Sequence, residues 1–277
     1  MKKYTAILLL FLSTTLTLAQ KKDKVKGSKT VTVEQKKVGD FEALEVEDNL
    51  EVHLERGEKT ELKIEADDNL HDIISFDLRD KILRIYTAKE AVNYKKLIVR
   101  VTYTKDLNLI TSKNESTINA IQEIQLDNLT FKAYDFSQLY LNVNAKNFIL
   151  QADDKSKTEL NLKSENAIIE LSKNSFLKTL VTTIDLKVDL YQKSNATIEG
   201  DATNAILRLD NNSTFIGNKL TIKNADVTTE SYSNCSLNAT TTVIIDAADK
   251  SEIQLVGAPE IEIRKFADEA KLVKKLK

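Results

Sequence analysis

The chain has 277 residues, of which 42% are hydrophobic and 30% charged, a composition ordinary for a globular protein. Its formal net charge of −2 is too mild to point to nucleic acid as a partner. A single cysteine, Cys235, excludes an internal disulfide. With six glycines and one proline, the turns must be formed by Asn, Asp, Ser and Lys.

Residues 1–19 have the pattern of a secretory signal peptide. Two lysines precede an apolar stretch at residues 6–12, and Leu18-Ala19 offers a small residue for cleavage. This stretch is too short to span a membrane, and no other apolar run is longer, so no transmembrane segment is expected. The protein is therefore expected to be exported, to the periplasm or to the cell surface or beyond. Residues 20–29 are predicted to form a disordered basic linker before a single β-solenoid domain at residues 30–277.

Residues 30–110 are rich in strand patterns but lack a fixed period. Apolar and polar residues alternate at residues 41–47, 50–55, 60–65 and 97–103, as in strands with one buried face. Residues 56–59 predict a hairpin-like turn, and residues 69–75 a single helical turn. We expect this region to form irregular opening coils that cover the N-terminal end of the solenoid.

Residues 111–258 contain a serine that returns every 18 to 21 residues. The column consists of Ser116, Ser137, Ser156, Ser175, Ser194, Ser213, Ser233 and Ser251. A fixed period of this size is typical of a solenoid in which each repeat forms one coil. Alternate residues before and after each serine are apolar, so each coil contains two short strands and two turns. The sequence thus predicts an all-β, parallel β-helix with about 19 residues per coil and two main sheets.

A second polar column lies nine residues before the serines. It consists of Asn128, Asn147, Asn166, Asp185, Asn204, Asn224 and Thr242. Asn tolerates the left-handed backbone of a tight corner, and stacked carboxamides hydrogen-bond from coil to coil. The serines are expected to serve the other corner in the same way. Both columns are interpreted as structural ladders, because a row of identical hydroxyls shares no catalytic base.

Residues 259–277 are expected to form a last coil and a basic tail. Pro259 opens this segment, and Ile261 and Ile263 are expected to point into the core. The end of the chain is rich in lysine, and this charge would discourage end-to-end stacking of two molecules.

Several segments resemble a known bacterial family. Residues 41–46, the strand that ends at Arg56-Gly57 and the Asp67-Asp68-Asn69-Leu70 step are similar to the GIN head domain (DUF2807) of auto-transporter adhesins. The resemblance covers about residues 30–275. It implies a single-stranded right-handed β-helix similar to pectin lyases, no recognised catalytic residues and a role in surface adhesion. The family's turn is usually Gly-Ser-Gly, whereas Lys155 and Lys157 flank Ser156 here.

Candidate catalytic and metal-binding residues are sparse. Asp135, Asp154 and Asp249 share a column two residues before the serine, but other residue types interrupt it. The isolated histidines, His53 and His71, are interpreted as solvated surface residues, and Cys235 as a buried structural thiol. We therefore expect no catalytic residue, cofactor or metal site. A calcium-dependent polysaccharide-processing enzyme stays open as an alternative, because pectin-lyase-like folds often cleave acidic glycans.

Two outward-facing sets of residues are candidate binding surfaces. Tyr134 and Tyr191 share one column and Tyr140 lies in another, where the rings could stack on sugars. A row of isoleucines seven residues before the serines could contact a partner or a second copy, or lie beneath a loop. This row consists of Ile149, Ile168, Ile206 and Ile244. The leading hypothesis is a non-enzymatic, adhesin-like or structural envelope protein that binds a cell-surface glycan or an envelope protein. A self-assembling envelope scaffold is the other alternative.

Overall fold

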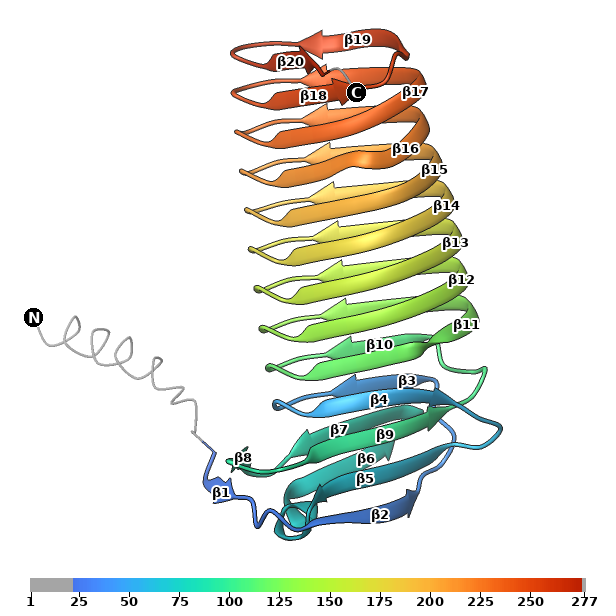
Figure 1. Ribbon diagram of the computed structural model, residues 1–277, viewed down its shortest axis with the longest axis vertical. Helices are drawn as coiled ribbons and strands as arrows, with labels where there is room; N and C mark the ends of the chain where they lie inside the picture. The colour runs from blue at the N-terminus through green and yellow to red at the C-terminus, as the bar shows by residue number, and fades with distance from the viewer. Residues whose placement is uncertain (1–21, 276–277) are drawn as a thin grey trace, which may run out of the picture.

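The computed structural model describes residues 22–275 and shows an all-β solenoid (Figure 1). About 69% of the chain is strand, and coils of about 19 residues stack in about nine turns. The fold class expected from the sequence is therefore confirmed. The signal peptide expected at residues 1–19 lies outside the described residues.

The regular coils are long parallel strands that pair with their neighbours in sequence. They are β11 (Thr117–Ala133), β12 (Gln138–Ala152), β13 (Lys157–Leu171), β14 (Phe176–Leu190), β15 (Asn195–Leu209), β16 (Thr214–Thr229) and β17 (Asn234–Ala247). Between β12 and β14 the register advances by one repeat per coil, so that Leu139 lies beside Thr158 and Thr158 beside Leu177. In Figure 1 tight turns form one edge of the stack, and bends within the strands form the other.

Each long strand contributes to both sheets because it bends at one corner. Inward and outward residues alternate along β12 until Lys146 and Asn147, two successive residues that both leave the core. This single break in the alternation turns the chain, so that Ala145 and Phe148 on either side of it are both buried. The core is the layer between the two sheets.

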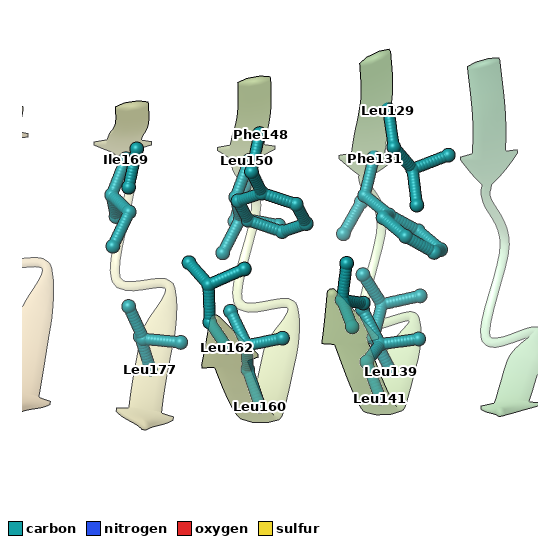
Figure 2. Close-up of a cluster of buried hydrophobic side chains, with 14 of the residues drawn as sticks. Leu129, Phe131, Leu139, Leu141, Phe148, Leu150, Leu160, Leu162, Ile169 and Leu177 are labelled. Atoms are coloured by element: carbon teal, nitrogen blue, oxygen red, sulfur yellow. The ribbon is translucent and has the colours of Figure 1, made fainter. Parts of the chain in front are cut away.

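Apolar side chains stack in columns inside the tube (Figure 2). Phe131 and Phe148 lie in adjacent coils, with ring centroids 6.2 Å apart and the ring planes tilted by 42°. Both are fully buried, as is Leu150, which lies beside Phe131 in the ladder. Burying such a side chain stabilises the fold by about 1.5–3 kcal/mol, so the stacked columns hold the coils together.

A tight turn joins consecutive coils at the other corner. After β11, the N–H of Ser137 donates to the carbonyl of Tyr134 at 3.0 Å. The two residues between them, Asp135 and Phe136, have φ angles of 52° and 63°. Positive φ at both central positions defines a type I′ turn, which Asn and Asp tolerate better than most residues.

The N-terminal region extends both sheets and covers one end of the stack. In one sheet, β2 (Val31–Lys37) and β5 (Glu61–Asp67) are antiparallel, and β9 (Leu97–Tyr103) joins β5 to β4 (Glu51–Arg56), which pairs with β11. The other sheet runs through β6 (Ile74–Arg79), β7 (Ile82–Thr87), β3 (Ala43–Val46) and β10 (Leu109–Ser112). A 3-10 helix, η1 (Asp68–Ile73), supplies the expected helical turn. The hairpin expected at residues 56–59 is wrong, because β9 lies between β4 and β5.

The described part of the expected linker is attached to this cap. Strand β1 (Lys24–Lys26) pairs with β8 (Glu90–Val92), which contradicts the expectation of disorder from residue 22 onward. The buried carboxylate of Asp67 accepts backbone N–H groups from Lys29 at 2.8 Å, Lys95 at 3.1 Å and Lys96 at 3.0 Å. Burial alone would raise the pKa of Asp67, but these donors outweigh it, so the pKa lies below its usual value.

The C-terminal end is less covered. The last strands are β18 (Glu252–Val256), β19 (Glu260–Phe266), which pairs with β17, and β20 (Lys271–Lys274), which pairs with β18. Ile261 and Ile263 continue the inward columns of Val243 and Ile245, as expected. Their side chains are nevertheless 43% and 51% exposed, because β19 is the last rung of its sheet among residues 22–275.

Candidate functional site

The carboxamide column forms hydrogen bonds along the bent corner. The Nδ2 atom of Asn147 donates to Oδ1 of Asn128 at 2.8 Å, and Asn166 donates in the same way to Asn147 at 2.9 Å. The hydrogen-bonded row continues in later coils, where Asn204 donates to Asp185 at 2.8 Å and Asn224 donates to Asn204 at 3.0 Å. Each amide thus donates to the coil below it, which makes this column a structural element and leaves little of it for a ligand.

The serine column lies at the tight turns and differs in its bonding. All eight serines are buried, because their side chains point inward beneath the turn. Ser213 Oγ donates to the carbonyl of Leu190 at 3.1 Å, and Ser251 Oγ to that of Ala248 at 2.8 Å. Within residues 22–275, no hydrogen-bond partner is present for the hydroxyls of Ser137, Ser156, Ser175 and Ser194. A small residue is therefore what this position requires, and the hydroxyls form no continuous ladder like that of the amides.

Tyr134 and Tyr191 lie at the two ends of one groove. Each is the first residue of a tight turn, and the column between them holds Asp153 and Ser172. They line a cavity of about 410 Å³ together with Gln151, Ala152, Asp153, Glu170, Leu171, Ser172 and Asp189. Burial raises the pKa of both tyrosines, so they are neutral phenols with partly covered rings. We call this cavity the tyrosine groove.

The walls of the tyrosine groove are polar. Gln151, Glu170 and Asp189 stand side by side in three successive coils, and Gln151 Nε2 donates to Glu170 Oε2 at 2.9 Å. Asp153 accepts a hydrogen bond from Lys173 Nζ at 2.9 Å. Burial opposes ionisation of Asp153, but Lys173 outweighs it and holds the pKa of this carboxyl below its usual value. The groove therefore combines aromatic ends with charged and amide acceptors.

Tyr140 lies on the opposite sheet, away from the other two tyrosines. It lines a second cavity of about 470 Å³ together with Ile121, Leu180 and polar residues from β12 to β15. Ile121 is 79% exposed and Leu180 53% exposed. The tyrosine columns expected to face outward do so, but they belong to two separate surfaces.

The isoleucine row is interrupted and half-covered. Ile149 and Ile168 are adjacent in the ladder and partly buried, and Lys187 separates them from the more exposed Ile206. Asp226 separates Ile206 from Ile244, which is also partly buried. The row therefore forms no continuous apolar stripe.

The residues considered for metal or acid–base chemistry are dispersed. Asp135, Asp154 and Asp249 lie in separate turns. Within residues 22–275 no group of three or more His, Cys, Asp or Glu side chains is arranged to hold a metal ion. No helix in this part of the chain is both long and apolar enough to cross a membrane.

His71 was expected at the solvated surface, and this expectation is wrong. Its side chain is buried beneath β2, and Nε2 lies 2.9 Å from Thr32 Oγ1. His53 is half-covered and hydrogen-bonds Glu51 at 2.7 Å. Cys235 is buried as expected, and burial raises the pKa of its thiol to about 12.

The walls of the tyrosine groove were missed in the sequence. Gln151, Glu170 and Asp189 all lie five residues before a serine of the repeat, and the tyrosines lie three before. Both columns point outward on the same strand face, so aligning them side by side would have revealed the groove.

Solved structures with the same fold include bacterial proteins of low sequence identity. A putative adhesin from Parabacteroides merdae ATCC 43184 has 17% identity and a TM-score of 0.63, covering 91% of this chain and 99% of that one. A putative lipid binding protein from Parabacteroides distasonis ATCC 8503 has 12% identity and a TM-score of 0.64, covering 91% and 100%. A putative adhesin from the same organism has 18% identity and a TM-score of 0.59, with the same coverage.

The sequence itself carries the family relationship. No curated protein matches it. The profile described as "Putative auto-transporter adhesin, head GIN domain" matches residues 40–179 and 157–259, which is most of the chain. The chain therefore belongs to this adhesin-like family, as its sequence resemblance indicated.

Proposed function

We propose that this protein is exported and acts without catalysis, as an adhesin-like protein that binds a cell-surface glycan or an envelope protein through a side face of its solenoid. Its family supports an adhesin-like role, and the signal-peptide pattern of residues 1–19 supports export. The observation that carries the proposal is the tyrosine groove, an open cavity with an aromatic ring at each end.

The solenoid is suited to binding because it holds side chains in place. Residues of the groove stand on β12, β13 and β14, whose backbones are paired along their length. Neighbouring coils are about 4.8 Å apart, the spacing of strands in any sheet. Side chains on such a frame lose little freedom when a ligand binds, which lowers the cost of binding.

Binding by the purified protein to a glycan array and to bacterial and animal cells tests this proposal. We expect retention on at least one glycan class or cell type, with no change in the size of any glycan. Depolymerisation of polygalacturonate in the presence of calcium at enzyme-like rates would contradict the non-enzymatic proposal and favour the polysaccharide-processing alternative. Absence of binding to every surface would contradict the adhesive role.

A second candidate function is self-association through the opposite sheet. Its support is the exposed apolar side chains of Ile121 and Leu180, with Phe176, 42% exposed, beyond Lys178 on the same face of β14. Exposed apolar side chains on one face favour contact with another protein surface. Light scattering of the purified protein tests this candidate: a concentration-dependent dimer that Leu180→Glu abolishes would support it, and a monomer at high concentration would contradict it.

A further inference from the structure

We propose that the tyrosine groove binds a short, neutral oligosaccharide. This inference rests on the proposed binding function and assigns the ligand class of its site. The groove is open to solvent along one edge of the sheet, and its volume of about 410 Å³ falls in the range of small-molecule sites.

The aromatic rings are spaced for a chain of sugars. Tyr134 and Tyr191 occupy the same position of the repeat, three coils apart. Three interstrand spacings place them roughly 14 Å from each other along the stack, a span that a short oligosaccharide covers. The face of a pyranose ring is rich in C–H groups and packs on tyrosine, while its hydroxyls stay free to hydrogen-bond.

One carboxylate oxygen of Asp189, Oδ1, is a hydrogen-bond acceptor that the described residues leave without a donor. The Asp189 side chain is only 7% exposed, although Val188 and Leu190 on either side point into the core and Asp189 points to the groove. Lys187 Nζ lies 2.7 Å from its Oδ2 atom. Its Oδ1 atom has no hydrogen-bond partner among residues 22–275.

A buried carboxylate oxygen without a donor is costly to the folded protein. A sugar hydroxyl that displaces the atoms covering this oxygen would donate to it and remove that cost. The neighbouring acceptors on Gln151 and Glu170 continue the same row and offer further sites for hydroxyl donors.

The charges of the groove favour a neutral glycan over an acidic one. Three carboxylates line it, on Asp153, Glu170 and Asp189. Lys173 pairs with Asp153 at 2.9 Å and Lys187 with Asp189 at 2.7 Å. Lys132 and Arg208 continue the row beyond Gln151 and Asp189 but do not line the groove. A uronic acid would bring a further negative charge to a lining that holds three carboxylates and no lysine or arginine.

The floor of the groove disfavours an extended peptide. It is formed by residues such as Ala152 and Leu171, which lie in interior strands paired on both sides. Strand addition requires a free sheet edge with unpaired N–H and C=O groups, and this floor has none. The side chains above it are too polar for the apolar anchors of a helical peptide.

Calorimetric titration of the purified protein with neutral and acidic trisaccharides tests the inference. The probes are cellotriose, mannotriose, maltotriose and chitotriose, with trigalacturonate as the acidic comparison. We expect at least one neutral probe to bind and trigalacturonate to bind at least about tenfold more weakly. Tyr134→Ala and Tyr191→Ala should each weaken binding about tenfold, the loss expected when a stacking ring is removed.

Matched variants separate binding from folding. Tyr191→Phe keeps the ring and should retain most of the affinity, whereas Asp189→Asn, which removes the charged acceptor, should weaken binding. Tyr140→Ala, on the opposite sheet, should leave it unchanged. Circular dichroism identifies any variant that fails to fold. If an alanine variant does not fold, the Tyr191→Phe and Asp189→Asn variants provide the test.

Three outcomes would overturn the inference: no neutral probe binds, trigalacturonate binds as tightly as the neutral probes, or binding survives both tyrosine-to-alanine changes. The proposed function is tested separately by adhesion. If the double variant Tyr134→Ala/Tyr191→Ala adheres to cells as the unaltered protein does, the inference fails while the adhesive function stands. If the unaltered protein adheres to nothing, the adhesive function itself fails.

Discussion

Phe148→Ala is expected to destabilise the solenoid strongly. Phe148 is 1% exposed and lies in the aliphatic column between the two sheets, against Phe131 of the coil below (Figure 2). Truncating a buried phenylalanine to alanine removes its burial and leaves a cavity, which costs about 3–5 kcal/mol. The measurement is the free energy of unfolding in urea, followed by circular dichroism of the β-structure.

The control is a phenylalanine in the same kind of strand with the opposite orientation. Phe176 opens β14, points outward and is 42% exposed, so Phe176→Ala should change the free energy of unfolding by less than about 1 kcal/mol. The double variant with Phe131→Ala should reveal a coupling of about 0.5–1.5 kcal/mol between the two rings. Equal losses for Phe148→Ala and Phe176→Ala would refute the assignment of the core to the inward columns.

Three further predictions concern the ladder, a special glycine and the thiol. Asp185 interrupts the amide column, since no donor runs from it to Asn166, so Asp185→Asn should add a hydrogen bond and raise the free energy of unfolding by about 0.5–1 kcal/mol; a loss of stability in urea would contradict this. Gly200 has a φ of +112°, and a Cβ there would clash with the carbonyl oxygen of Val181, so Gly200→Ala should cost about 3 kcal/mol or more in the same assay. An unchanged urea midpoint would show that the backbone relaxes at the β-bulge between Thr197 and Gly200, where the register of β15 and β16 shifts. Because burial raises the pKa of Cys235 to about 12, its thiol should resist a thiol reagent at mildly alkaline pH until urea unfolds the protein; rapid modification of the folded protein would contradict its burial.

The regular part of the fold was predictable because its signal is repeated. Each coil places an apolar residue six positions before its serine, and apolar residues alternate with polar ones around it. This alternation allows only one face of each strand to point into the core. The amide ladder was also readable, since Asn147 and Asn166 occupy the same place in successive repeats and hydrogen-bond as stacked amides do. The left-handed backbone expected at these asparagines is wrong, because the positive φ angles lie in the tight turns before the serines.

The cap was harder to predict because its contacts are distant in sequence. Strand β9 inserts between β4 and β5, so adjacency along the chain was misleading for the expected hairpin. Residues 24–26 pair with β8, 66 positions away, and Lys29 donates to Asp67, 38 positions away, whereas composition alone suggested a solvated linker. His71 is buried for the same reason, since β2 covers it from an earlier part of the chain.

The tyrosine groove was only partly predictable from the sequence. The tyrosines stood out as aromatic residues in outward columns, but the separation of Tyr140 from the other two follows from the position of the corner. Asp189 gave no signal in the sequence, because an outward position on a strand is normally exposed. In the ladder it lies between Glu170 and Arg208, and its burial follows from how these neighbouring coils pack.

Distances between spin labels on one column of the stack test the coil-by-coil geometry most directly. With Cys235 replaced by alanine, cysteines would be introduced as pairs: Gln138→Cys with Thr214→Cys, with Asn234→Cys or with Glu252→Cys. These positions are linked through successive ladder pairs, so the partners lie four, five and six coils above Gln138. Stacked coils predict mean label distances by pulsed electron paramagnetic resonance that rise by about 4.8 Å from each pair to the next. Distances that stay constant, or that change irregularly along this series, would contradict the stack of registered coils on which the groove and its ligand depend.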